Sequence, residues 1–156
     1  MKRNPTVILV RGALIAGVYA AVTMIFAPVS FGPVQVRVSE ALTVLPWIWI
    51  EAIPGLFVGC LIANLMGGFG VIDVIFGSAA TLAAAFLTSR MPTRRMAPIP
   101  PVVVNMVVVG AYLSVLLELP LISTMIYVGL GQAVACFGLG LPLLSFIEGR
   151  FPNEKN

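Results

Sequence analysis

Polar side chains that can bind a solute recur inside the long apolar segments of this 156-residue chain. Ionisable side chains are costly in such segments and usually face a bundle interior or a water-filled cavity. The expected topology places carboxylates, one arginine, amides and tyrosines in the outer half or near mid-depth of a membrane bundle. These candidate residues are Arg37, Glu40, Asn64, Asp73, Asn105, Tyr112, Tyr127 and Gln132. Together they predict a pocket for a flat, hydrogen-bonding solute.

Several of these residues also have a purely structural interpretation. Arg37 and Glu40 are three residues apart, so they can form an ion pair that fixes a helix end. Asp73 can be an acidic residue that the helix dipole stabilises at a helix N-terminus. The amides of Asn64 and Asn105 can join neighbouring helices by hydrogen bonds. The sequence leaves these alternatives open.

Covalent chemistry has little support in the residue types. The chain has no histidine, and Cys60 and Cys136 each lie alone in an apolar segment, where buried, unreactive thiols are expected. A cysteine–histidine zinc site, a histidine-based triad and a haem-ligating histidine are excluded. There is no glycine-rich phosphate loop, so we expect no ATP site, no metal and no other cofactor in this chain. An intramembrane enzyme would need two carboxylates brought together, and a stand-alone channel or proton-coupled carrier is a further alternative.

The composition is that of a membrane protein. Hydrophobic residues make up 60% of the chain and charged residues 10%, whereas soluble domains carry roughly 25% charged residues. The net charge is +3, and the basic residues sit at the two ends and in one central loop. This distribution is typical of topology signals and not of a face that binds nucleic acid.

Six apolar segments are expected to form membrane-spanning helices, at about residues 7–26, 37–50, 52–66, 71–88, 101–117 and 121–147. The second is short for a span of about 20 residues, and one alternative fuses it with the third. The positive-inside bias favours six spans, because Arg90, Arg94 and Arg95 then face the same side as the termini, which carry Lys2, Arg3, Arg11, Arg150 and Lys155. We therefore expect an all-α, multi-pass protein of the cell membrane. It is a single domain over residues 1–156, a compact bundle of six transmembrane helices with both termini in the cytoplasm.

Small residues form two rows on the first segment. Residues four apart share a helix face, so each row offers a smooth surface for close helix approach. One interpretation is packing within the bundle, and the other, slightly favoured by the presence of two adjacent rows, is docking onto another membrane protein. The rows are Gly12, Ala16 and Ala20, and Ala13, Gly17 and Ala21.

Four blocks of the chain, in order and with compatible spacing, resemble the queuosine-precursor (QueT-type) family. These blocks are SFGPVQVRVSEALTVLP at residues 30–46, EAIPGLFVGCLIANLMGGFGVIDVIFGS at 51–78, PPVVVN at 100–105 and YVGLGQAVACFGLGLPLL at 127–144. Members of this family are substrate-binding S components of energy-coupling factor (ECF) transporters. The resemblance covers most of the chain.

The resemblance implies a six-helix subunit that binds a vitamin-like solute from outside. It implies docking, through the small residues around Ala16 and Ala20, on a transmembrane coupling subunit driven by two cytoplasmic ATPases that use the ATP. The implied ligand is a 7-deazaguanine such as 7-aminomethyl-7-deazaguanine, or queuine. Position 132 is a glutamine, whereas the family often has an acidic residue there, so the exact precursor stays open. Another vitamin or a purine-like solute also stays open as an alternative ligand.

The residues fit such a ligand physically. A guanine-type edge presents adjacent N–H donors, and one carboxylate accepts two of them at once. An aminomethyl group is cationic and favours a second acidic group. We expect Glu40 to bind the base edge and Asp73 the cationic arm, and the reverse assignment stays open.

Overall fold

The structure, a computed structural model, describes residues 4–31 and 36–151, and these form helices and connections with no strand. Lys2, Arg3 and Lys155, which contribute to the predicted charge bias, lie outside the described residues. The helical elements are α1 (Pro5–Ile25), α2 (Ala27–Ser30), η1 (Val38–Trp47), α3 (Ala52–Gly67), η2 (Asp73–Gly77), α4 (Ser78–Ser89), η3 (Arg94–Met96), α5 (Ile99–Leu116), α6 (Leu121–Ala133), η4 (Val134–Gly140) and α7 (Leu141–Arg150). The prediction of an all-helical fold is confirmed.

Local signals fix several helix ends. Asn4 caps α1, since its side chain accepts a hydrogen bond from the Thr6 amide at 3.0 Å, and Pro5 occupies the first helical turn. At the end of α3, Gly68 adopts a φ of 82°, a left-handed conformation that glycine enters without steric cost. The helix boundaries therefore fall close to those predicted for the apolar segments.

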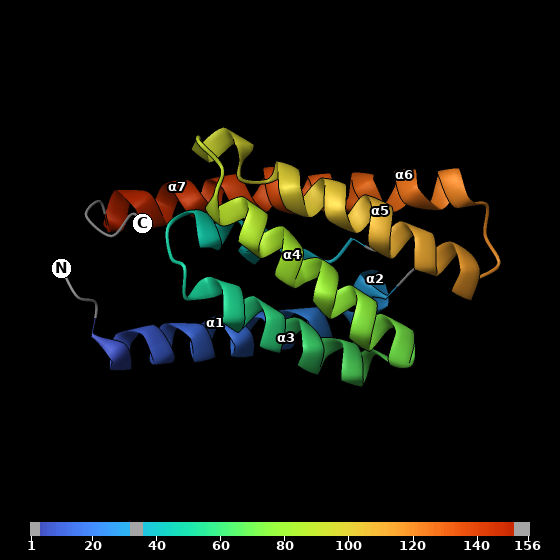
Figure 1. Ribbon diagram of the computed structural model, residues 1–156, viewed down its shortest axis with the longest axis horizontal. Helices are drawn as coiled ribbons and strands as arrows, with labels where there is room; N and C mark the ends of the chain where they lie inside the picture. The colour runs from blue at the N-terminus through green and yellow to red at the C-terminus, as the bar shows by residue number, and fades with distance from the viewer. Residues whose placement is uncertain (1–3, 32–35, 152–156) are drawn as a thin grey trace.

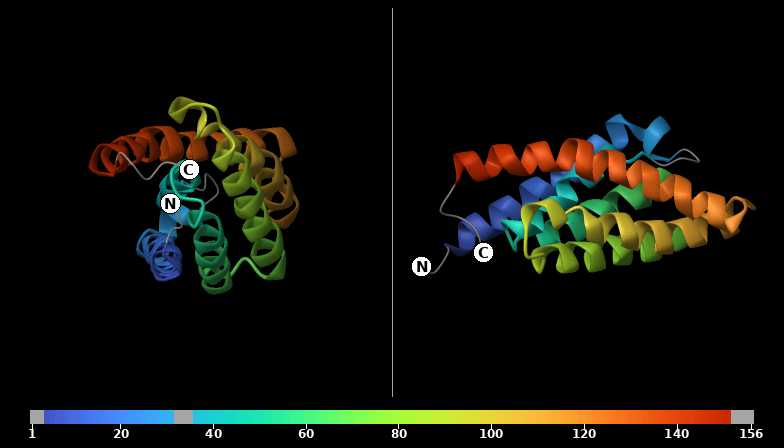
Figure 2. Two further views of the ribbon diagram at one scale, coloured as in Figure 1. Left: turned by 60° about the vertical axis from the view of Figure 1, so that its left-hand side comes forward. Right: turned by 90° about the horizontal axis from the view of Figure 1, so that it is seen from above.

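The long elements run along one axis in alternating directions (Figure 1). In chain order these are α1, η1, α3, η2 with α4, α5, and α6 continued through η4 into α7. Pro5, where α1 begins, and Arg150, where α7 ends, lie toward the same end of the bundle (Figures 1 and 2). In the described part of the chain, three continuous helical stretches are long and apolar enough to cross a membrane: Pro5–Ile25, Arg94–Leu116 and Leu121–Arg150.

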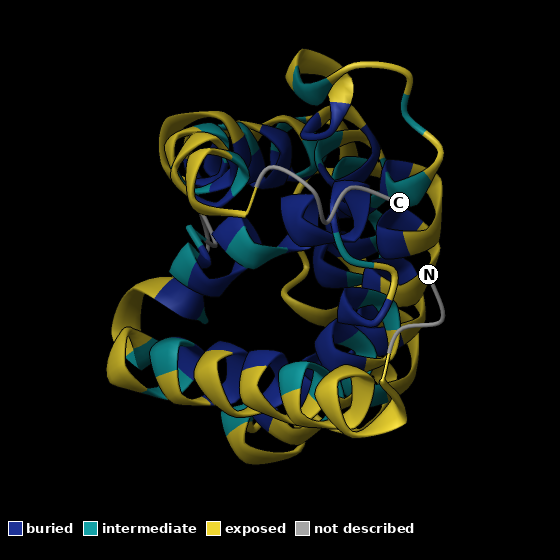
Figure 3. Cartoon of the chain, turned by 90° about the vertical axis from the view of Figure 1, so that its left-hand side faces the viewer, coloured by how far each residue is buried: buried dark blue, intermediate teal, exposed yellow. Residues whose placement is uncertain are grey.

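The bundle is apolar outside and partly polar inside: its helices turn exposed faces outward and buried faces inward (Figure 3). Large apolar side chains such as Leu9, Ile25 and Val115 are exposed on the outer faces, whereas Arg37, Glu40 and other polar residues are buried. In water such a surface would cause aggregation, whereas hydrocarbon favours it. The distribution identifies a membrane protein.

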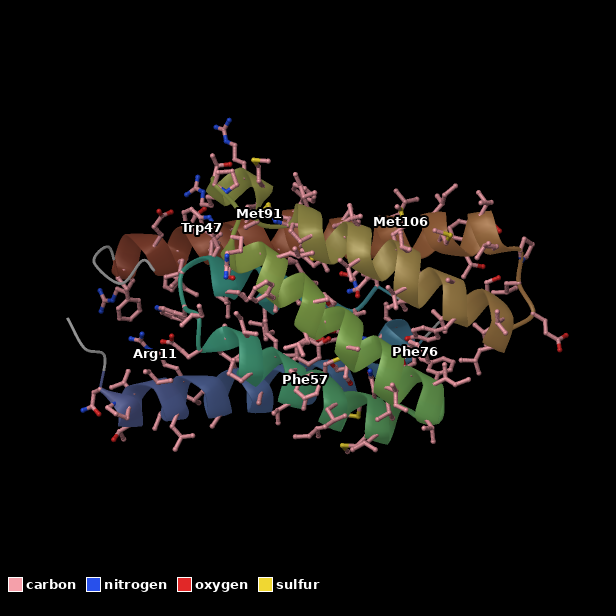
Figure 4. The ribbon with its side chains drawn as sticks, in the orientation of Figure 1. Arg11, Trp47, Phe57, Phe76, Met91 and Met106 are labelled. Carbon is pink, nitrogen blue, oxygen red and sulfur yellow. The ribbon has the colours of Figure 1, made fainter. Side chains whose placement is uncertain are left out.

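The second predicted segment differs from a lipid-facing span. Element η1 is a ten-residue 3-10 helix, and eight of its residues are buried, so that it runs through the bundle interior. Its C-terminal end is tied to the loop after α4, because the Trp47 indole N–H donates to the Met91 carbonyl at 3.0 Å (Figure 4). The sequence anticipated a separate, short segment here but not its 3-10 geometry.

The two small-residue rows of α1 have different surroundings. Ala16 and Ala20 are buried, and Gly12 and Ala16 face α3, where a Cβ added at Gly55 would lie 2.6 Å from the Gly12 carbonyl oxygen. Helix packing inside the bundle thus occupies much of the face that carries Gly12, Ala16 and Ala20, whereas a docking role for these residues stays a prediction. The other row, Ala13, Gly17 and Ala21, is exposed.

Because α1 packs closely on α3, replacing glycine by alanine should affect thermal stability differently at Gly59 and at Gly17. At Gly59 an added Cβ would lie 2.8 Å from the Ala16 carbonyl oxygen, whereas at Gly17 nothing lies within 4 Å. Gly59→Ala should lower the midpoint of thermal unfolding in detergent. Gly17→Ala should leave it unchanged or raise it, because alanine favours a helix by about 1 kcal/mol over glycine. Equal midpoints for the two variants would contradict the α1–α3 contact.

Candidate functional site

Three irregular helices converge where the polar residues gather. Glu40 lies on the 3-10 helix η1, Asp73 begins the π-helical stretch η2, and Cys136 lies in the second π-helical stretch, η4. Runs of 3-10 helix longer than about four residues are uncommon, and π-helical turns occur frequently at functional sites. Irregular backbone therefore marks the same region as the buried polar side chains.

The first half of the site is built around the Glu40 carboxylate, which is 1% exposed. The Tyr19 hydroxyl donates a hydrogen bond to one carboxylate oxygen. The Asn105 amide donates to the other at 3.2 Å. Asn105 Oδ1 is buried without a hydrogen-bond partner among the described residues. A buried polar atom without a partner is costly, so this oxygen is available to a ligand donor.

The second half is a chain of hydrogen bonds from Arg37 to Tyr112. The Arg37 guanidinium donates to Asn64 Oδ1 at 3.0 Å, and Asn64 Nδ2 donates to the Asp73 carbonyl at 3.0 Å. The Tyr112 hydroxyl donates to Asp73 Oδ1. The other carboxylate oxygen, Asp73 Oδ2, is buried with no partner in the part of the chain that the structure describes. Each carboxylate of the site thus accepts a hydrogen bond from one tyrosine.

A small cavity lies between the two halves. Its lining comes from five elements and the residue before η1: Arg37, Glu40, Gly77, Thr81, Asn105, Val109 and Gln132. Its volume is about 10 Å³, roughly the room that one water molecule needs. The cavity therefore has no room for a ring-sized ligand unless its lining moves apart.

The structure brings together seven of the eight predicted site residues, all except Tyr127. Arg37, Glu40, Asn64, Asp73, Asn105 and Gln132 are buried, and Tyr112 joins them through Asp73. Tyr127 is 51% exposed on α6, so the structure does not bring it together with the buried residues.

Arg37 and Glu40 do not form the ion pair that their spacing allows. Among the described residues no carboxylate oxygen lies within 4.0 Å of the Arg37 guanidinium, which contacts Asn64, the Cys60 sulfur at 3.8 Å and the ring of Phe31. Buried charges are normally paired or well hydrogen-bonded. The arginine therefore has donor capacity directed at the cavity that it lines.

Sequence reasoning missed Tyr19, Thr81 and the roles of both cysteines. Cys60 accepts a hydrogen bond from the Thr81 hydroxyl at 3.3 Å, and Cys136 donates to the Glu40 carbonyl at 3.4 Å. Both thiols are free and buried, as expected. Tyr19 is the only tyrosine of the first segment, and it follows Ala16 by three residues, so both lie on one helix face. This spacing was the signal in the sequence that could have identified Tyr19.

The arrangement suits recognition by hydrogen bonding. It presents acceptors at Glu40, Asp73 and Asn105 and donors at Arg37 inside an apolar shell. Among the described residues, Glu40 and Asp73 form no hydrogen bond with one another, so they do not make the carboxylate pair of an aspartyl enzyme. The geometry supports a binding site for a planar solute with both donors and acceptors.

Comparison with known proteins gives a match over most of the chain. The sequence model of a family described as "QueT transporter" matches residues 9–149. A relative named "Queuosine precursor transporter QueT", from Lactococcus lactis subsp. cremoris (strain MG1363), is 36% identical over 84 residues. That alignment covers 53% of this chain and 49% of the relative, so the chain matches about half of the relative's length. No solved structure matches.

Proposed function

Because the chain belongs to the QueT transporter family, we propose that it is the substrate-binding membrane subunit of an importer that captures a queuosine precursor from outside the cell. The ligand class is a 7-deazaguanine such as 7-aminomethyl-7-deazaguanine, or queuine. The observation that carries this proposal is the closed polar cavity between Glu40 and Arg37 in an otherwise apolar bundle.

The chemistry of the cavity fits the edge of a guanine-type ring. Glu40 accepts from adjacent ring and amino N–H groups, and Arg37 donates to the neighbouring ring carbonyl. Asn105 Oδ1 accepts a further N–H, which gives this buried oxygen a partner from the ligand. The flanking apolar surface of Val109 contacts the ring face.

The proposed topology has six membrane passes with both termini in the cytoplasm, in the cell membrane. The alternating course of the six long elements supports it, as does the common end at which α1 begins and α7 ends (Figure 1). Arg90, Arg94 and Arg95 lie toward that same end, in and beside the connection from α4 to α5. An even number of passes puts this basic loop on the side of the termini.

In the proposed assembly, the subunit works with an ECF module: a transmembrane coupling subunit and two cytoplasmic ATPases. The exposed row Ala13, Gly17 and Ala21 supports this part of the proposal, because it lines a shallow apolar groove on the outer face of α1. Small side chains there allow a partner helix to approach closely. ATP is used by the partner subunits, and this chain holds no cofactor.

Two alternative functions are distinguishable by experiment. A stand-alone carrier would move the solute in liposomes that contain this chain alone, whereas a binding subunit would not. A subunit for another vitamin or a purine-like solute would bind that compound more tightly than any deazaguanine. Binding calorimetry on the purified protein with deazaguanines, vitamins and purines tests the proposed ligand class directly.

Glu40→Gln should weaken deazaguanine binding by more than tenfold. The substitution keeps the size of the side chain but turns one acceptor oxygen into a donor that faces the ligand's N–H. A charge-assisted hydrogen bond contributes roughly 1.5–3 kcal/mol, and about 1.4 kcal/mol corresponds to a factor of ten. Calorimetric titration of the wild-type and variant proteins measures the change.

The matched control is Glu51→Gln. Glu51 is also buried, at 2% exposure, but it pairs with Arg11 at 3.4 Å outside the cavity. This variant should lose stability while keeping the wild-type affinity. Glu40→Gln should reduce the affinity for a ligand without the exocyclic amino group by a smaller factor than the affinity for the deazaguanine. An equal loss of affinity for both ligands would show that Glu40 does not bind the edge of the base.

A topology experiment tests the six-pass arrangement. A cysteine placed at Thr93, in a version of the protein that lacks Cys60 and Cys136, should resist an impermeant thiol reagent in intact cells. It should react after the membrane is permeabilised, because the basic loop is cytoplasmic. Efficient labelling from outside would contradict six passes with cytoplasmic termini.

Docking is tested by the same substitution on two faces of α1. Ala13→Trp should preserve the fold and the ligand affinity but abolish co-purification with the coupling subunit and uptake into cells, since it fills the exposed groove. Ala16→Trp should reduce thermal stability and ligand binding, because Ala16 is 6% exposed and packs against α3. Normal uptake with Ala13→Trp would rule out this groove as the docking surface.

A further inference from the structure

The connection from α4 to α5, residues 90–98, is fixed to the bundle at both of its ends. The Thr88 hydroxyl, near the end of α4, donates to the Ala97 carbonyl at 3.1 Å and so joins the two ends of the connection. The Trp47 indole N–H of η1 donates to the Met91 carbonyl at 3.0 Å (Figure 4). Ala97 itself is buried. The connection therefore presents its side chains from a defined backbone.

This connection carries an excess of positive charge. It holds three arginines, Arg90, Arg94 and Arg95, and no acidic residue. Arg94 pairs with Glu148 of α7 at 3.4 Å. In the part of the chain that the structure describes, no carboxylate lies within 4.0 Å of Arg90 or Arg95. These two exposed guanidinium groups are therefore open to an external anion.

Arg90 lies where the charged connection meets the apolar outer surface. Its Cζ atom is 4.8 Å from the centroid of the Phe86 ring. Phe86 is 49% exposed on α4, and Leu87 and Ile99 are exposed beside the two ends of the connection. Arginines at a membrane surface rest their apolar stem on such side chains and keep the charge in the headgroup layer. The arginine thus lies at the depth where lipid phosphates are found.

The chemistry of the two groups favours a phosphate that belongs to a lipid. The planar guanidinium donates two parallel N–H bonds to phosphate oxygens, and basic clusters next to membrane helices attract anionic lipids. A charge bias that only sets topology needs neither a fixed backbone nor a defined side-chain position. Here the backbone is fixed, and Arg90 is placed against an exposed aromatic ring along which an acyl chain can lie.

We propose that Arg90 and Arg95 bind the phosphate of an anionic phospholipid whose acyl chains lie on the exposed apolar surface around Phe86. The lipid supplies the negative charge that this connection lacks. Its chains bury apolar surface of α4 that a soluble phosphate compound would leave uncovered. The site is separate from the polar cavity, so it does not depend on which solute the protein binds.

The test is a titration of the full chain in detergent with dioleoylphosphatidylglycerol, with the first bound lipid measured by native mass spectrometry. The comparison lipid is dioleoylphosphatidylcholine, which has the same chains and a phosphate but no net charge. The wild-type protein should bind the anionic lipid at least about fivefold more tightly. Arg90→Gln and Arg95→Gln should each weaken binding of the anionic lipid by about fivefold, the contribution of one basic side chain near a membrane surface. Both variants should leave binding of the neutral lipid unchanged.

The matched control is Arg150→Gln. It removes an exposed arginine at the end of α7, outside the connection, and should change binding of the anionic lipid by less than about twofold, because distant exposed charges are screened. Equal losses in this variant and in Arg90→Gln would overturn the site, since any surface charge would then have the same effect. Equal wild-type affinities for the two lipids would also overturn it.

Two further outcomes would assign the arginines to another partner. Glycerol 3-phosphate has a phosphate but no acyl chain, so it should not displace the bound lipid. Displacement would show a site for soluble phosphate compounds and would overturn the lipid assignment. An unchanged lipid preference in Arg90→Gln, together with loss of co-purification with a coupling subunit, would show that the arginine binds a protein surface instead.

Discussion

A lipid environment cannot form hydrogen bonds, and this constraint governs the arrangement of the whole molecule. Polar side chains in the apolar segments must find partners inside the bundle or lie at its ends. Glu40, Asn64, Asp73 and Asn105 come from four different elements, yet all are buried. Their mutual contacts fix how those elements are placed, so the force that excludes polar groups from lipid also assembles the binding site.

Helix α1 connects this site with the outer surface. One face of the helix carries Tyr19, which holds the Glu40 carboxylate, and Ala16, which packs on α3. Ala13, Gly17 and Ala21 lie on another, exposed face. A rotation of α1 that repacks its outer face would also move the tyrosine that orients Glu40, because both belong to one rigid helix. In the proposed assembly, this helix would lie between the solute site and the coupling subunit.

The sequence predicted the order and the approximate ends of the helices, because hydropathy and charge-bearing loops report directly on a bilayer. It also singled out most of the polar residues that the structure gathers in the bundle interior, since a charge in an apolar segment is too costly to keep unless it faces that interior. It could not separate the two rows of α1: Ala16 and Gly17 have similarly small side chains, and only the position of α3 decides which one is buried. Tyr19 and Gly77 were missed because their roles depend on neighbours distant in the chain.

The 3-10 geometry of η1 has a consequence for how so short a segment can belong to a bundle of longer helices. A 3-10 helix rises about 2.0 Å per residue and an α-helix about 1.5 Å. The ten residues of η1 therefore extend about 20 Å, where an α-helix of the same length would extend about 15 Å. This reach is about two thirds of a hydrocarbon layer of about 30 Å. The stretched backbone lets this buried segment extend further along the bundle than ten α-helical residues would, while the neighbouring α-helices surround it.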